Sequence, residues 1–171
     1  YKRQHQGMTE NFRMNRLLMW IQPENYSSGI GYQTVQGLYA IGSGGLFGKG
    51  LGKSLQKLGF IPESQNDMIF SIICEELGLF GAMCIILVFA LMLWRIIHIA
   101  QNAPDLFGTM LAAGVFAHVA VQVVLNIAVV TNFIPNTGVS LPFISYGGTA
   151  SFFLLLEMGI VLNISSKIRL E

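Results

Sequence analysis

Long apolar runs separated by short polar connections dominate the second half of the chain. Residues 77–94 carry no charged side chain, and further apolar runs extend over residues 106–133 and 143–164. At about 1.5 Å rise per residue, a run of this length spans most of a roughly 30 Å hydrocarbon core. The pattern predicts three transmembrane helices, over about 68–94, 106–133 and 143–164.

The first 67 residues follow a different pattern. They are polar up to residue 33, and residues 34–60 then mix apolar side chains with glycines and lysines. Glycine lets a backbone approach another surface closely, and lysines beside apolar residues suit lipid headgroups or phosphates. We therefore predict a large loop with amphipathic segments over residues 1–67, followed by a three-helix transmembrane unit over residues 68–171.

Composition supports a membrane protein over a soluble domain. Hydrophobic residues make up 53% of the chain, charged residues 11%, and the mean hydropathy is +0.57. Such values are unusual for a soluble chain of this length. The predicted fold class is an all-α polytopic membrane protein. Because the chain does not begin with Met and shows no cleavable signal peptide, we expect it to be a fragment.

The flanks of the predicted spans indicate the orientation. Arg95 and His98 follow the first span, and Lys167 and Arg169 follow the third, whereas residues 134–142 carry no charge. Short basic flanks face the cytoplasm. We therefore expect a cytoplasmic C-terminus and residues 1–67 outside, since loops beyond about 60 residues escape the rule and tolerate outer lysines and arginines.

Glycines close to lysines invite a comparison with phosphate-binding loops. Neither Lys49 nor Lys53 has the glycine and the hydroxyl residue at the spacing that a nucleotide phosphate loop requires, so nucleotide binding is not predicted. Lys49, Lys53 and Lys57 remain candidates for contact with phosphate or lipid headgroups. For each lysine alone, a solvated side chain on the membrane surface explains the sequence equally well.

Polar side chains also occur inside the predicted spans. His118, Gln122 and Asn126 recur every four residues and so share one face of a helix. Hydrogen bonding between helices is the usual reason for such a stripe, with direct substrate contact as the alternative. A lone histidine is a weak metal ligand, and no metal site is predicted. Glu157 lies deep in the third span without an obvious partner in this chain.

Asp67 stands at the edge of the first predicted span. A carboxylate there is costly to keep and suggests a function. The structural alternative is a carboxylate that stabilises a helix start through the helix dipole. Asp67 and Glu75 would lie about 12 Å apart along a helix axis, which is too far for a pair of carboxylates that act together on one sugar.

Two stretches carry a resemblance to a known family. The stretches are "GYQTVQGLYAIGSGGLFGKGLGKSLQKLGFIPESQNDMIFSIICEELGLFG" and "QVVLNIAVVTNFIPNTGVSLPFISYGGT". They resemble the FtsW/RodA/SpoVE (SEDS) family, and their residues are most similar to its FtsW cell-division branch. The likeness runs from about residue 16 to the end. Family members have about ten transmembrane helices, so the resemblance implies the last three helices and the large extracellular loop before them. Of the family's Pro-Glu-x-His-Thr-Asp pattern, residues 62–67 keep the aspartate but lack the histidine and threonine.

The resemblance implies a peptidoglycan glycosyltransferase of the bacterial plasma membrane. Such an enzyme polymerises lipid II during cell division with a class B penicillin-binding protein and other division proteins, and no nucleic acid is involved. The family's catalytic aspartate corresponds to Asp67, which would take the proton of the attacking hydroxyl. The pyrophosphate leaving group needs positive charge, from basic side chains or from a divalent cation such as magnesium or manganese. The expected substrate-binding residues are Lys49, Lys53, Lys57, Glu63, Gln122, Asn126, Thr137 and Ser145.

Two other functions fit the same features. A lipid II flippase would also have a polar-lined bundle and a basic outer loop, and a non-catalytic scaffold of the division machinery would only recruit the partner synthase. A transporter places charge near the membrane midplane in both halves, and here only Glu157 and the polar stripe lie there. Asp67, at the predicted outer mouth, fits chemistry on exported substrate better.

Overall fold

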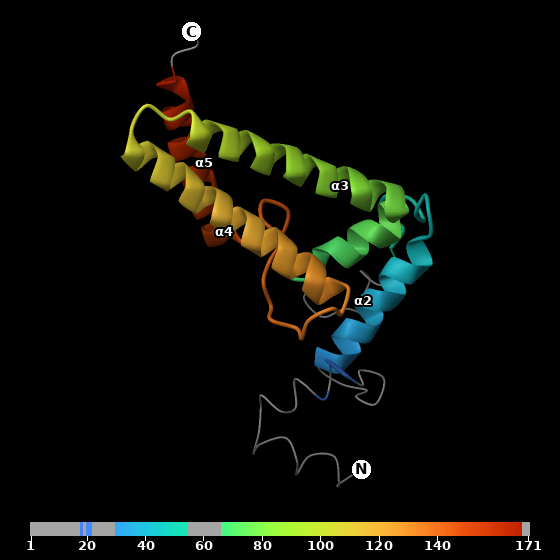
Figure 1. Ribbon diagram of the computed structural model, residues 1–171. Helices are drawn as coiled ribbons and strands as arrows, with labels where there is room; N and C mark the ends of the chain where they lie inside the picture. Colours follow the sequence, from blue (N-terminus) through green and yellow to red (C-terminus); the bar gives the residue numbers. More distant parts are fainter. Residues whose placement is uncertain (1–17, 19, 22–29, 55–65, 169–171) are drawn as a thin grey trace.

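The computed structural model describes residues 18, 20–21, 30–54 and 66–168. Every regular element in these ranges is a helix, which confirms the all-α prediction. Figure 1 shows their arrangement, with α3, α4 and α5 grouped together and α2 lying against one end of α3. The elements are α2 (Ile30–Gly44), α3 (Ile69–Gln101), α4 (Leu106–Val130) and α5 (Gly148–Ser166).

Helices α3, α4 and α5 are each long and apolar enough to cross a membrane. Their bounds differ from the sequence prediction at several ends. Helix α3 continues seven residues beyond position 94, to Gln101, and stops shortly before Pro104, which disfavours helix at the residue preceding it. Helix α5 begins at Gly148 rather than at 143, because residues 142–147 form turns.

A break at Gly78 divides α3 into a short arm, residues 69–77, and a long apolar part, residues 79–101. Gly78 has φ +69° and ψ −170°, which is outside the helical region. The sequence prediction of one uninterrupted span missed this break. A side chain at position 78 would collide with the backbone of Leu46 and Gly48, so glycine is required there for space as well as for conformation.

The segment that approaches the break is the glycine loop, residues 45–54, which follows α2 directly. Its backbone replaces the hydrogen bonds that α3 loses at the break, and Figure 1 shows this loop beside the bend of α3. The four bonds are Lys49 N to Glu75 O (2.9 Å), Gly50 N to Glu76 O (2.9 Å), Leu79 N to Gly45 O (2.9 Å) and Phe80 N to Leu46 O (3.1 Å). The glycines therefore serve a close backbone approach, as the sequence indicated, and the surface approached is α3.

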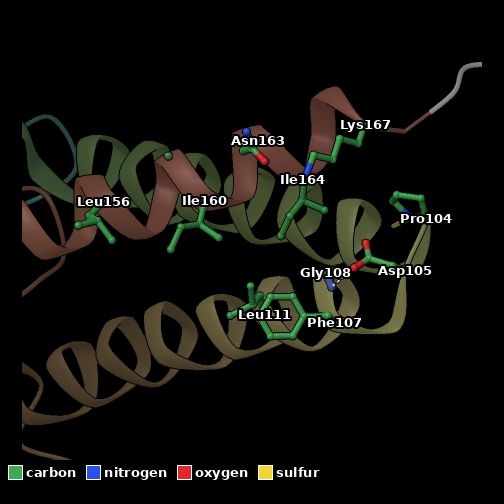
Figure 2. A pocket seen from close by; sticks show the side chains of 11 residues that line it. Pro104, Asp105, Phe107, Gly108, Leu111, Leu156, Ile160, Asn163, Ile164 and Lys167 are labelled. Carbon is green, nitrogen blue, oxygen red and sulfur yellow. Dashed lines mark hydrogen bonds between the residues drawn. The ribbon is translucent and has the colours of Figure 1, made fainter.

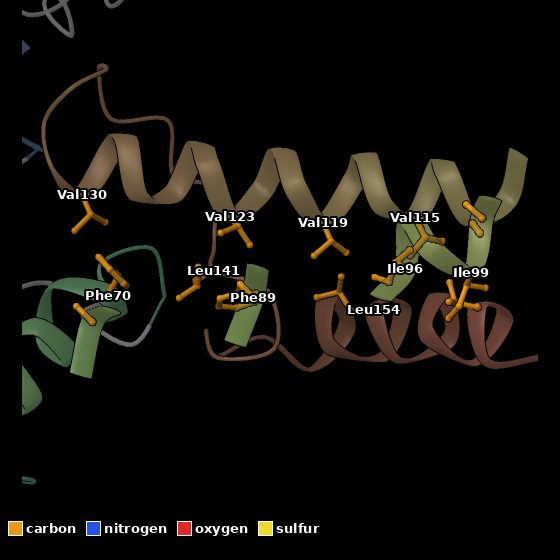
Figure 3. Packing of buried hydrophobic residues seen from close by; sticks show 14 of the residues in the cluster. Phe70, Phe89, Ile96, Ile99, Val115, Val119, Val123, Val130, Leu141 and Leu154 are labelled. Carbon is orange, nitrogen blue, oxygen red and sulfur yellow. The ribbon is translucent and has the colours of Figure 1, made fainter. Parts of the chain in front are cut away.

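The core lies where α4 packs against both α3 and α5. Figure 3 shows a row of α4 valines spaced four residues apart that faces side chains of the other two helices. The row comprises Val115, Val119 and Val123, and it meets Ile96 of α3 and Leu154 of α5. Large apolar side chains also cover the outward faces of α3, α4 and α5, as expected of surfaces that contact lipid or other membrane helices.

Candidate functional site

Asp67 lies just before α3, two residues ahead of its first residue, Ile69. Met68 occupies the N-cap position, and Asp67 is the residue before it, close enough to the helix start for the dipole alternative to stay open. The Asp67 side chain is half-buried, and its Oδ1 accepts a hydrogen bond from Nε2 of Gln33 at 3.1 Å. Gln33 belongs to α2, so the helix that precedes the glycine loop orients the carboxylate.

Asn126 fixes the backbone of Asp67 from α4. Its side chain is fully buried, and its Nδ2 donates to the carbonyl oxygen of Asp67 at 2.9 Å and to that of Val139 at 2.8 Å. One amide thus joins the start of α3 to the connection between α4 and α5. Asn126 was predicted as a substrate contact, but the structure shows its amide nitrogen bound to two carbonyls of the protein itself.

Ser145 performs a similar task on the neighbouring residue. Its Oγ donates to the carbonyl oxygen of Asn66 at 2.7 Å and accepts from the backbone nitrogen of Leu141 at 2.7 Å. The segment before α5 is therefore attached to the residue before Asp67. Each such bond contributes about 1 kcal/mol, and together with the Asn126 bonds they restrict where Asp67 can point.

An open pocket of about 650 Å³ adjoins this network. It lies between the first residue of α3 and the start of α5, and Ser145 forms part of its wall. Its lining residues are Ile69, Ile144, Ser145, Tyr146, Gly147, Gly148 and Ser151. Thr137, another predicted substrate contact, is exposed on the connection that precedes the pocket wall. Asp67 does not line the pocket, but Ile69, two residues further along the chain, does, and the volume is large enough for part of a sugar-linked substrate.

The predicted phosphate-binding lysines fall into different environments. Lys49 Nζ forms an ion pair with Oε1 of Glu75 at 2.7 Å, and the Glu75 side chain is fully buried. Lys53 is exposed on the glycine loop. Lys57 and Glu63, also predicted to contact substrate, lie outside the described residues. Sequence reasoning missed the burial of Glu75, although a carboxylate inside an apolar run was a signal that a partner must exist.

The polar stripe on α4 joins α5 through a contact between a histidine and a carboxylate. His118 Nδ1 lies 2.9 Å from Oε2 of Glu157, and Gln122 Nε2 lies 3.1 Å from His118 Nε2. The expectation that Glu157 has no partner in this chain is therefore wrong, because the partner is one helix away and periodicity within α5 cannot reveal it. Hydrogen bonding between helices, the favoured explanation of the stripe, accounts for His118, whereas the contact of Gln122 with His118 lies within α4.

Comparisons with known proteins agree with this architecture. A family profile described as "cell cycle protein" (FtsW/RodA/SpoVE) matches residues 6–170. Stage V sporulation protein E of Bacillus subtilis is 48% identical over 154 residues, covering 90% of this chain and 42% of the relative. The probable peptidoglycan glycosyltransferase FtsW of the same organism is 42% identical over 169 residues, covering 99% of this chain and 42% of the relative. The chain thus spans about two fifths of the curated relatives it matches.

Solved structures show the same fold. A chain from a structure entitled "Structural coordination of polymerization and crosslinking by a peptidoglycan synthase complex" superposes with a TM-score of 0.70 at 23% identity, covering 95% of this chain and 44% of that one. The rod shape determining protein RodA of Thermus thermophilus, in an aspartate-to-alanine mutant, gives a TM-score of 0.60 at 30% identity, covering 79% of this chain and 41% of that one. The chain belongs to the FtsW/RodA/SpoVE family of cell cycle proteins.

Proposed function

We propose that this chain is the C-terminal part of a peptidoglycan glycosyltransferase and that Asp67 is its catalytic base. The complete protein polymerises lipid II during cell division, together with a class B penicillin-binding protein. The observation that carries the proposal is the convergence of three distant segments on Asn66 and Asp67, through Gln33, Asn126 and Ser145, with Ser145 also lining an open pocket. The names of the FtsW relatives support the glycosyltransferase part of the proposal.

The reaction needs one base. A hydroxyl oxygen of the acceptor sugar attacks the anomeric carbon of the donor, the bond to the lipid pyrophosphate breaks with inversion, and the hydroxyl proton passes to the Asp67 carboxylate. Gln33 orients this carboxylate, and Asn126 fixes the peptide that carries it. Such positioning matters because a base must lie within hydrogen-bond reach of the proton that it takes.

The departing pyrophosphate requires positive charge, which Lys53 and Lys57 are proposed to supply because Lys49 is bound to Glu75. A magnesium or manganese ion would add Lewis-acid charge at the phosphates. Within residues 30–54 and 66–168 no three His, Cys, Asp or Glu side chains are grouped to hold a metal. The described residues therefore do not form a protein cage for a metal ion, and the proposed steps use the side chains of the chain alone.

The proposed orientation places Asp67 on the outer face, where lipid II is available after export. Thiols introduced at Asn136, in the connection before α5, should react with a membrane-impermeant reagent added outside. Thiols at Asn102, after α3, should react only from inside. Cys84, the exposed native cysteine, is changed to Ser in both variants. Labelling of Asn102 from outside would overturn the orientation.

The proposal is tested by polymerisation of labelled lipid II by the complete protein with its partner synthase. We expect Asp67→Asn to lower the rate by about 10² to 10⁴, because an amide cannot accept the hydroxyl proton. A matched control is Asp105→Asn at the start of α4, where the Asp105 side chain accepts a hydrogen bond from Gly108 N (Figure 2). Asn keeps this N-cap, so the variant should retain the wild-type rate within about twofold. Equal rates for the two variants would contradict the assignment of Asp67.

One observation favours a flippase as the second candidate. His118, Gln122 and Glu157 form a polar group inside two helices that could cross a membrane, and such groups often mark a transport path. A flippase would move labelled lipid II across a vesicle membrane, and Glu157→Gln would slow that movement without a change in polymerisation. A scaffold would do neither, in any variant.

A further inference from the structure

Glu75 is a fully buried carboxylate whose role the proposed reaction does not explain. Besides the ion pair with Lys49, its Oε1 accepts from Oγ of Ser43 at 3.4 Å, and its Oε2 accepts from Oγ of Ser54. Removing an ion pair from water costs several kcal/mol per ion, so a buried pair adds little net stability compared with apolar side chains of the same volume. The pair instead favours one arrangement of the segments that it joins.

That arrangement joins three consecutive parts of the fold. Ser43 lies at the end of α2, Lys49 and Ser54 lie in the glycine loop, and Glu75 lies in the arm of α3. The backbone bonds between the glycine loop and the α3 break connect the same parts. Without the docked loop, the break would leave backbone groups unpaired near the membrane, at a cost of several kcal/mol. The bend of α3 and the docking of the glycine loop therefore form together.

The bend has a direct consequence for the proposed active site. The arm, residues 69–77, begins two residues after Asp67 and is about 12 Å long. A rotation of the arm by about 10° about the break at Gly78 would move its far end by roughly 2 Å. A misplacement of about 1 Å can lower a catalytic rate about 10²-fold. A small change in the bend angle at Gly78 would therefore move Asp67 far enough to affect the rate.

We propose that Lys49 and Glu75 form a latch that positions Asp67 by fixing the bend of α3. This inference rests on the proposed function, and it makes Glu75 and Lys49 positioning residues that do not touch the substrate. It also replaces the prediction that Lys49 binds the lipid pyrophosphate. Lys53, four residues along the same loop and exposed, supplies a matched control for the distance measurement, because it carries the same charge outside the latch.

The latch is tested first by a distance in the complete protein. Nitroxide labels are attached to cysteines at Leu51 in the glycine loop and Gln101 at the end of α3, both exposed, with Cys84 changed to Ser. Residues 79–101 extend over about 33 Å, a distance suited to pulsed electron resonance. We expect Lys49→Met to broaden the distance distribution, Lys53→Met to leave it narrow, and Lys49→Arg to restore it.

Lipid II polymerisation then connects the latch to the site. Lys49→Met should lower kcat roughly 10- to 100-fold with KM within about threefold. Lys167→Met, which removes an exposed lysine after α5, should keep kcat. A narrow distance distribution in Lys49→Met, or a broad one with wild-type kcat, overturns the proposal. A salt-dependent rise in KM alone would show instead that Lys49 binds phosphate. The distance between the labels is measured without substrate, so it tests the latch alone. Failure of the proposed function would appear separately, as normal polymerisation by Asp67→Asn.

Discussion

Helices α3 and α4 are both apolar and long enough to cross a membrane, yet they are built differently. Helix α4 is continuous and presents a row of core valines, whereas α3 breaks at Gly78 and holds the buried Glu75 beside the break. The candidate base, Asp67, lies at the start of the broken helix. The irregular helix α3 thus carries the candidate base at its start, and the regular helix α4 supports that base through the buried amide of Asn126.

The difference has a physical cause. A continuous helix satisfies its own backbone hydrogen bonds, so α4 needs no polar neighbour along its length. The break in α3 leaves four backbone groups that only another backbone can pair at such close range, and the glycine loop supplies it. The irregular end of α3 thus depends on a distant segment, and changes in either segment should affect both.

The largest effect is expected from filling the space between the loop and the break. A Cβ at Gly48 would collide with the backbone of Glu76 and Gly78, and its φ of +76° favours glycine. We expect Gly48→Ala to lower the free energy of unfolding by about 2–4 kcal/mol. Gly114→Ala in α4, where a Cβ meets nothing within 4 Å, should change it by less than about 1 kcal/mol. Equal losses in detergent unfolding would remove the distinction between the two helices.

A smaller effect separates two polar side chains one turn apart on α4. Asn126→Ala leaves the carbonyls of Asp67 and Val139 without their amide donor, so we expect a loss of about 1–3 kcal/mol in stability and a 10- to 100-fold lower polymerisation rate. Gln122→Ala removes the contact between the amide nitrogen of Gln122 and His118. This variant should keep the polymerisation rate within about threefold. The opposite ranking would mean that Gln122, as the sequence predicted, contacts substrate.

The smallest effect is expected at the pair between α4 and α5. His118→Phe breaks the contact with Glu157, and hydrogen bonds between membrane helices contribute about 0.6 kcal/mol on average. We therefore expect the free energy of unfolding to fall by about 1 kcal/mol and the polymerisation rate to stay unchanged. Both quantities are measured on the same purified protein. Glu157→Gln, which keeps a hydrogen-bonding group, serves as the control. A large loss of polymerisation rate in His118→Phe would show that this pair takes part in the reaction. It would also weaken the contrast between α3 and α4.

Sequence reasoning reached the helices because hydrophobic runs of sufficient length have one stable solution in a membrane. The same reasoning drew attention to Asp67 and Asn126, since polar groups beside apolar runs need a reason, and Ser145 was named with the family resemblance; their catalytic and substrate-binding roles stay predictions. It missed the break at Gly78 and the burial of Glu75. Both depend on contacts between residues 43–54 and 75–80, and periodicity within one helix carries no information on such pairing.

The bonds of Asn126 and Ser145 could not be assigned from the sequence for the same reason. A polar side chain in a membrane needs a partner, but the pattern does not tell whether that partner is a substrate or the protein. The structure shows both side chains bound to the backbone next to Asp67. Their contact with substrate stays a prediction, whereas their support of Asp67 is a structural observation.

The most direct test of the central claim compares the rate and the stability of two Asp67 variants. If Asp67 is the base, Asp67→Asn and Asp67→Ala of the complete protein both lose lipid II polymerisation by about 10² or more, while their melting temperatures stay near wild type. If Asp67 only supports the start of α3, Asp67→Asn polymerises at the wild-type rate and Asp67→Ala loses about 1 kcal/mol of stability. The second result would contradict the assignment of catalysis to the broken end of α3.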